Sequence, residues 1–232
     1  MGLGPKREKT LARILDAALD EFEQKGFLGA SLRNIVKTAG VTTGAFYSYF
    51  DSKEELFAAL TARHYYWMLD RFEQAQQAFT ALPDEDKPSR MNGVSSACID
   101  EMLEYAYEYP REVRLLLVGA EGTSFEHMKD MMIDAELLAT CGYLDMLKKL
   151  GQGNPRVDMD LMHIIITGMF NAFFEIIIHQ MPREKAAEYL RQLKEFYFAG
   201  WARLLGMDAA ERPQDGPVRE ERTREERSQE ER

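Results

Sequence analysis

The sequence predicts an all-α protein, and three observations point to this fold class. Apolar residues recur every three to four positions along nearly the whole chain, which is the spacing of one helix face. We find no convincing run of alternating apolar and polar residues, the pattern of a half-buried strand. Two capping boxes, Ser52 with Glu55 and Thr123 with Glu126, mark expected helix starts. At 232 residues, the chain falls between one and two domains by size.

The first three expected helices are closely spaced. The first ends near Gly26, and its apolar face is formed by Leu11, Ile14, Leu15, Ala18 and Phe22. A second helix over 32–39 has Ser31 in the N-cap position and ends at Gly40. A third short helix covers about 43–49.

A long helix then begins at Ser52 and runs to about Thr80, where a proline-containing, charged loop follows. Further helices are expected over 91–109, 111–120, 124–150, 157–180 and 183–206. From residue 207 onward the apolar periodicity ends, and a highly charged tail with no face to bury is expected to be disordered. The predicted units are therefore 1–52, 53–206 and 207–232.

The second and third helices have the pattern of a helix-turn-helix. Gly40 breaks the chain between them, and Val41 supplies the apolar turn residue that pins one helix to the other. Phe46 and Phe50, four residues apart, fit the inner face of the second helix of the pair. Its outer face is left with small and polar residues: Thr42, Thr43, Gly44, Tyr47 and Ser48. In this motif the second helix enters the major groove of double-stranded DNA.

Charge is unevenly distributed along the chain. The net charge of −10 argues against non-specific binding of polyanions, because an acidic surface repels phosphate. Between residues 25 and 53, however, basic residues outnumber Asp51, the one acidic residue in that segment. A basic arm precedes it: Lys6, Arg7, Lys9 and Arg13. Contact with nucleic acid is therefore expected to be local.

Residues 10–57 contain a dense series of short motifs in a fixed order. The first half of the series is Ile14-Leu15-Asp16-Ala17-Ala18, Phe22, Gly26-Phe27, Ser31-Leu32-Arg33-Asn34-Ile35 and Ala39-Gly40-Val41. The second half is Thr43-Gly44-Ala45-Phe46-Tyr47, Tyr49-Phe50 and Ser52-Lys53-Glu54-Glu55-Leu56. Together these motifs resemble the DNA-binding domain of the tetracycline-repressor (TetR/AcrR) family. The resemblance implies an N-terminal three-helix DNA-binding domain, a C-terminal helical ligand-binding and dimerisation domain, and a sequence-specific homodimeric repressor released from its operator by a small molecule.

The resemblance also implies which residues contact DNA: Ser31, Arg33, Thr42, Thr43, Gly44, Tyr47, Tyr49 and Lys53. Ser31 would meet a phosphate at a helix N-terminus, and Arg33 would reach either a guanine edge or a phosphate. Gly44 would let the helix backbone approach the groove. The phenol of Tyr49, where many family members have histidine, would hydrogen-bond a phosphate, as would Tyr47 and Lys53. The alternative is that both tyrosines pack in the helical core and that Lys53 is merely solvated.

The last two expected helices each carry a broad apolar face. On the first it comprises Leu161, Ile164, Ile165, Gly168, Met169, Ala172, Phe173, Ile176 and Ile177. On the second it comprises Tyr189, Leu190, Leu193, Phe196, Tyr197, Gly200, Trp201 and Leu204. Two such faces per subunit fit a four-helix bundle between two copies, and an ordinary core within one chain is the alternative. The resemblance favours the homodimer.

A pocket for an unknown small-molecule effector is expected in the second unit. Its candidate residues are Trp67, Tyr105, Glu121, Phe125, Met128, Met132, His163, Asn171 and Glu175. Methionines suit an adaptable apolar pocket, although aromatic and methionine residues at this spacing also build plain core. The last three form a polar stripe with Thr167 and His179, which either lines the pocket or bonds across the dimer. The ligand is expected to be apolar or aromatic, and it is either neutral or cationic. A pocket smaller than about 300 Å³ would count against a ligand-responsive protein. His64, on the long helix, either reports ligand occupancy to the DNA-binding end or is solvated.

No catalytic triad, metal-ligand spacing or phosphate-binding glycine loop is found, so an enzyme, a metal and a cofactor are not expected. Cys98 and Cys141 fit small core residues of a protein in a reducing compartment, which predicts a cytoplasmic protein. The most apolar stretch of the chain is interrupted by polar residues, so no membrane span is expected. An alternative function is a DNA-binding protein of this fold without a ligand, acting through protein partners or as an architectural factor. Activation in place of repression also stays open.

Overall fold

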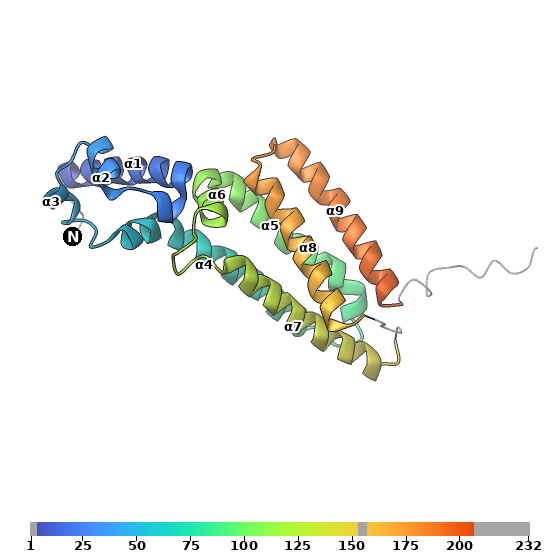
Figure 1. Cartoon of the computed structure of the whole chain (residues 1–232). Coiled ribbons are helices and arrows are strands. Elements are labelled where there is room, and N and C mark those ends of the chain that lie inside the picture. The colour runs from blue at the N-terminus through green and yellow to red at the C-terminus, as the bar shows by residue number, and fades with distance from the viewer. Residues whose placement is uncertain (1–3, 153–156, 207–232) are drawn as a thin grey trace, which may run out of the picture.

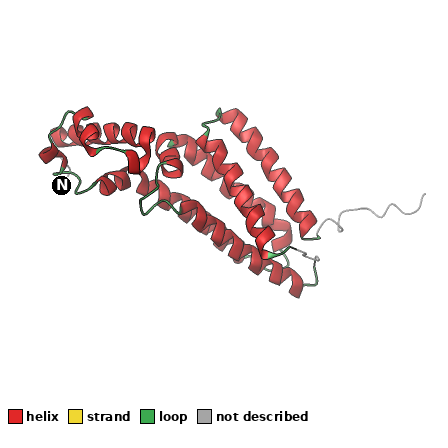
Figure 2. Cartoon of the chain, viewed as in Figure 1, coloured by secondary structure: helices red, strands yellow, loops and turns green. Residues whose placement is uncertain are grey.

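The computed structural model describes residues 4–152 and 157–206, and within these ranges every regular element is a helix (Figures 1 and 2). The elements are α1 (Pro5–Gly29), α2 (Leu32–Thr38), α3 (Thr43–Phe46), α4 (Lys53–Thr80), α5 (Lys87–Glu108), α6 (Pro110–Val118), α7 (Met128–Lys149), α8 (Met159–Ile178) and α9 (Arg183–Leu204). The predicted all-α class is confirmed. The charged tail predicted over 207–232 lies outside the described residues.

The N-terminal helices form where their caps predict. Gly26 has a positive φ of 66°, so the chain kinks at the position where the first helix was expected to stop, before a last turn to Gly29. The Ser31 hydroxyl caps α2 by accepting a hydrogen bond from the Asn34 amide at 3.4 Å. Helix α3 is shorter than predicted. After Phe46 the backbone forms tighter turns with hydrogen bonds between residues three positions apart, such as the bond from the Tyr49 amide to the Phe46 carbonyl at 2.9 Å.

Helix α4 runs from the N-terminal helices into the C-terminal bundle, so one rigid element connects both halves (Figure 1). The Ser52 hydroxyl accepts from the Glu55 amide at 3.0 Å, which confirms the first capping box. The prediction that the second capping box, Thr123 with Glu126, starts a helix was wrong. Thr123 closes a turn through the Ala120 carbonyl at 2.7 Å, and α7 begins only at Met128.

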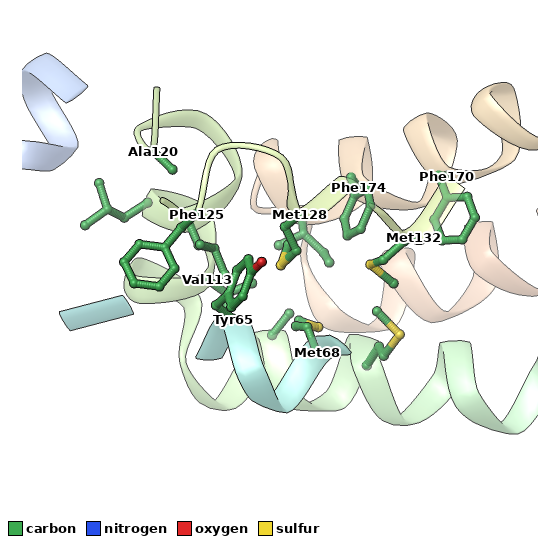
Figure 3. Packing of buried hydrophobic residues seen from close by; sticks show 14 of the residues in the cluster. Tyr65, Met68, Val113, Ala120, Phe125, Met128, Met132, Phe170 and Phe174 are labelled. Atoms are coloured by element: carbon green, nitrogen blue, oxygen red, sulfur yellow. The ribbon is translucent and has the colours of Figure 1, made fainter. Parts of the chain in front are cut away.

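One apolar core cluster contains residues of both halves, and Figure 3 shows a part of it around α4 and α7. At the junction, the Phe57 ring of α4 stacks on Phe125 with 6.3 Å between centroids, and Tyr65 meets Phe125 edge-on at 5.1 Å. Further along the bundle Met128 and Met132 are buried near Phe174, as Figure 3 shows. A displacement of α6 or α7 therefore presses directly on α4.

Helix α8 is long and apolar enough to cross a membrane by length and composition, and one such helix is weak evidence for a span. Only 39% of its most apolar window is buried inside this chain. The rest of its surface faces outward together with α9, where Ile164 is 64% and Phe196 is 71% exposed. This pair of helices therefore presents an unusually apolar outer surface.

Candidate DNA interface and ligand cavity

The helix-turn-helix is built around residues that the sequence assigns to its inside. Ile35 and Phe46 are fully buried, and the Phe46 and Phe50 rings lie 5.8 Å apart between centroids. Val41, half-buried in the turn, packs against this core. Its amide bonds the Val36 carbonyl at 3.2 Å and so closes the end of α2. Helices α2 and α3 are thereby held with α3 on the outer side.

The outward surface of α3 is open. Thr42 caps the helix by accepting from the Ala45 amide at 3.1 Å. Thr43 is exposed, and Tyr47 is 50% exposed. A Cβ added to Gly44 would meet nothing within 4 Å, so the helix backbone lies bare at this point. Arg33, also exposed, lies on the neighbouring α2.

The first turns of α1 lie beside α3 (Figure 1). The Arg7 guanidinium donates to the Ser48 carbonyl at 3.1 Å, and its charge lies 5.2 Å from the centre of the Tyr49 ring. The Tyr49 hydroxyl donates to the Arg7 carbonyl at 3.2 Å, so this phenol is engaged within the domain. Lys6 and Lys9 are exposed at the same end. The basic arm that the sequence showed thus adds positive charge next to α3.

Two other basic residues of this region are used inside the domain. Lys53 donates to the carbonyls of Phe27 at 2.6 Å and Ala30 at 3.2 Å, so its ammonium does not stand free for a phosphate. Arg13 donates to the carbonyls at the end of α2, including that of Gly40 at 3.1 Å. Both cations satisfy helix-terminal carbonyls, where the helix dipole favours positive charge.

Glu21 is a structural residue that the sequence analysis missed. Its Oε1 accepts from the Ser31 amide at 3.0 Å and from the Lys25 ammonium at 2.7 Å. The bond from Lys25 lowers the pKa of Glu21, with the bond from the Ser31 amide as the next cause. This carboxylate occupies the helix N-terminus at which a phosphate was expected beside Ser31. A Glu ten residues before an N-cap serine is the only sequence signal for it.

A cavity of about 120 Å³ lies in the C-terminal bundle among α4, α5, α7, α8 and α9. Its wall is mostly aromatic and aliphatic: Phe72, Ala75, Phe79, Cys98, Ile99, Met102, Ala139, Met169, Phe170, Phe173, Phe198, Trp201 and Leu205. Polar groups are few: Gln76, Ser95, Glu136, Thr140 and Tyr143. Burial raises the pKa of the Cys98 thiol to about 11, so the thiol stays protonated and unreactive.

None of the ligand residues expected from the sequence lines this cavity. Phe125, Met128 and Met132 are buried in the core, which was the alternative for them. Trp67 and Tyr105 stack on each other with 3.7 Å between ring centroids, beside an open acidic depression.

The remaining expected ligand residues are on the surface. Glu121, His163, Asn171 and Glu175 are all exposed, the last three along the outer face of α8. The Glu175 carboxylate lies 2.8 Å from the imidazole of His179 on the next turn. The polar stripe of α8 faces away from the cavity within this chain.

His64 is fully buried, so it is not the solvated residue that was one of two expectations. Its Nε2 accepts from Arg63 at 2.9 Å, and its Nδ1 lies 2.9 Å from the Tyr105 hydroxyl. Because Nε2 is an acceptor, the ring proton lies on Nδ1 and is donated to the phenol. Desolvation lowers the pKa of His64 to about 4, and the nearby charge of Arg63 acts in the same direction.

The exposed second helix, the short turn and the three-helix core define a helix-turn-helix DNA-binding protein. Residues 14–60 match the family model for bacterial regulatory proteins of the tetR family. The match covers about a fifth of the chain, and similar proteins over this segment are named transcriptional regulators.

Several named transcriptional regulators are similar to this chain in sequence over a part of its length. The chain is 52% identical over 48 residues to the HTH-type transcriptional regulator YdgC of Bacillus subtilis, covering 21% of this chain and 25% of that protein. It is 46% identical over 55 residues to the HTH-type transcriptional regulator SrpR of Pseudomonas putida, 24% and 26% of the two chains. It is 32% identical over 109 residues to the HTH-type transcriptional repressor SCO4008 of Streptomyces coelicolor, 47% and 48% of the two chains. The matches thus span between a quarter and a half of these relatives.

Solved structures share the fold over most of the chain. A TetR-family regulator from Streptomyces coelicolor, SCO3833, superposes with a TM-score of 0.56 at 16% identity, covering 81% of this chain and 90% of that one. A TetR-like regulator from Rhodococcus sp. RHA1 gives a TM-score of 0.51 at 21% identity, covering 84% and 96%. At these identities the likeness concerns the fold and not the ligand or the operator.

Proposed function

We propose that the chain is a homodimeric, sequence-specific DNA-binding repressor whose affinity for its operator falls when a small molecule binds the C-terminal domain. The observation that carries the DNA-binding part is the open surface of α3, with Thr43, Gly44 and Tyr47 facing outward. The DNA contacts we propose are this surface together with Thr42, Arg33 and the exposed lysines of α1. Ser31, Tyr49 and Lys53 have internal partners and are expected to position these groups.

The apolar outer surface of α8 and α9 supports the dimer. Ile164 and Phe196 are mostly exposed there, although large apolar side chains normally favour burial. A second copy on this face would cover the apolar residues and offer partners to the polar stripe. Two copies would also present two α3 helices to two half-sites.

The contact between the two halves supports ligand control. The Phe27 amide at the kink of α1 donates to the Gly119 carbonyl at the end of α6, at 2.8 Å. On the same side, Arg111 of α6 bonds Glu23 of α1, and it bonds Asp20 at 2.6 Å. Helix α4 lines the cavity with Phe72, Gln76 and Phe79 and begins beside the helix-turn-helix. A ligand that changes the spacing of these helices would favour a conformation whose two α3 helices no longer match the operator.

A second candidate function follows from the cavity volume. The 120 Å³ is below the range of about 300 to 1,000 Å³ that is common for small-molecule sites. This favours a DNA-binding protein of the same fold that acts through protein partners. For ligand control to hold, the ligand must be near the size of one aromatic ring, or the cavity must widen around it.

Selection of DNA from a random pool with the purified full chain tests the DNA-binding part. On the recovered site, Arg33→Ala and Tyr47→Phe are expected to weaken binding, whereas Lys149→Ala, an exposed lysine at the far end of α7, is the matched control. Equal affinity of all three variants and the parent would refute the proposed interface. A screen of small molecules for release of that site separates ligand control from the ligand-free alternative.

A further inference from the structure

Glu136 is the one carboxyl group among the described residues that line the cavity wall, which is mostly apolar. It projects from α7, and Gln76 of α4 donates a hydrogen bond from Nε2 to its Oε2. No lysine, arginine or histidine in residues 4–152 and 157–206 bonds this carboxyl. The amide holds the carboxyl in place without neutralising it. Burial accordingly raises the pKa of Glu136, and the bond from Gln76 opposes that rise only in part.

An acid in such a place has two ways to avoid an uncompensated charge. It takes up a proton, or it receives a cation at its open oxygen. The cavity in front of Glu136 is free space, and the residues facing it include the rings of Phe72, Phe170 and Trp201. Aromatic faces attract cations, and their edges give an organic body a dry surface to pack on. The cavity wall thus combines one carboxyl group with an apolar surface that favours contact with hydrocarbon groups.

The volume limits the size of the occupant. A cavity of about 150 Å³ accepts a benzene molecule in another protein, so the 120 Å³ found here suits a body of about one ring with small adjustments of the side chains. A metal ion does not fit this wall, because a single carboxylate and one amide give too few oxygen ligands.

We propose that this cavity binds a small organic ammonium ion, with its nitrogen against the Glu136 carboxylate and its ring or short chain against Phe72, Phe170 and Trp201. Gln76 is a positioning residue, since its amide hydrogen bonds one oxygen of the carboxylate. Only the expected consequence of ammonium binding, the release of DNA, rests on the proposed function. Binding of the ammonium ion itself is independent of it.

Cyclopentylamine and cyclopentanol provide the test, because each is about the size of one ring, they have nearly the same shape, and only the amine is charged at pH 7.5. Isothermal titration of the full chain is expected to show the amine binding about tenfold or more tightly than the alcohol, the size of effect that a close charge pair gives. Glu136→Gln keeps the shape and the bond to Gln76 and is expected to abolish this preference. Asp134→Asn is the matched control, because it removes the same charge from an exposed position on the same helix and should keep the preference.

The parent protein alone can refute the proposal, so folding of the variants does not decide it. Equal binding of amine and alcohol to the parent, no binding of either, or a preference that survives Glu136→Gln would overturn it. The same amine is then added to the complex with the selected DNA site. If it binds through Glu136 but leaves DNA affinity unchanged, ligand control of this site fails and the ammonium proposal stands. If DNA is released equally by amine and alcohol, control stands and the ammonium proposal fails.

Discussion

Lys53→Met removes the ammonium at the start of α4 and keeps most of the aliphatic stem. In the structure this ammonium bonds the Phe27 carbonyl at 2.6 Å and the Ala30 carbonyl at 3.2 Å, and it lies 4.4 Å from the centre of the Phe27 ring. It therefore ties α4 to the end of α1, at the corner that carries the helix-turn-helix. The resemblance to the TetR family had instead implied a contact with DNA phosphate.

The two roles predict different magnitudes in different assays. A hydrogen bond to a charged group contributes about 1.5 to 3 kcal/mol, and here one of the two bonds is long and the lysine is partly solvated. Lys53→Met is therefore expected to lower the free energy of unfolding by about 2 kcal/mol, measured by urea titration. Lys37→Met, an exposed lysine on α2, is the matched control and should change it by less than about 0.5 kcal/mol.

DNA binding supplies the second measurement. If Lys53 serves only the fold, the slope of log affinity against log salt on the selected site stays at the parent value. Loss of one phosphate contact would instead flatten that slope by about 0.9 per site lost. An unchanged urea midpoint together with a flattened slope would refute the internal role and restore the phosphate contact.

Three further perturbations have defined outcomes. Gly40→Ala should cost about 1 to 3 kcal/mol of unfolding free energy, since φ is +60° and the added Cβ would lie 2.5 Å from an Arg13 nitrogen; an unaltered urea midpoint would contradict this. His64, with its pKa lowered from 6.5 to about 4, is neutral in the fold, so stability should fall by about 3 kcal/mol from pH 6.5 down to pH 4. That slope should flatten in His64→Gln, and an identical pH profile would count against it. Ile164→Glu combined with Phe196→Glu should convert a dimer into a folded monomer in sedimentation velocity, and a persistent dimer would exclude this face.

Local signals predicted the elements well. Ser31, Thr42 and Ser52 each accept the hydrogen bond that an N-cap residue is expected to accept. The helix-turn-helix was predictable because all of its determinants lie within about twenty residues and act on neighbours along the chain. Thr123 failed as a cap because a short turn back to Ala120 competes for the same hydroxyl, and sequence spacing does not distinguish the two.

The candidate cavity in the C-terminal bundle was not predictable in the same way. Met128 and Phe125 have the residue types of an adaptable pocket, yet they fill the core between α4 and α7. Glu136, which faces the cavity, lies on a helix with several other acidic residues and has no distinguishing neighbour in the sequence. Its partner Gln76 is sixty positions earlier in the chain. Only the crossing of α4 and α7 brings the two together.

The sequence by itself determined the all-helical class, the N-terminal caps of α2 and α4 and the helix-turn-helix motif, because each depends on periodicity and capping between residues a few positions apart. The tertiary structure decided which polar groups remain available. It engaged Lys53 with carbonyls twenty-three and twenty-six positions away and left Arg33 exposed. The physical reason is that a cation near an unpaired helix-terminal carbonyl bonds it in preference to water, and that proximity exists only after the helices have packed.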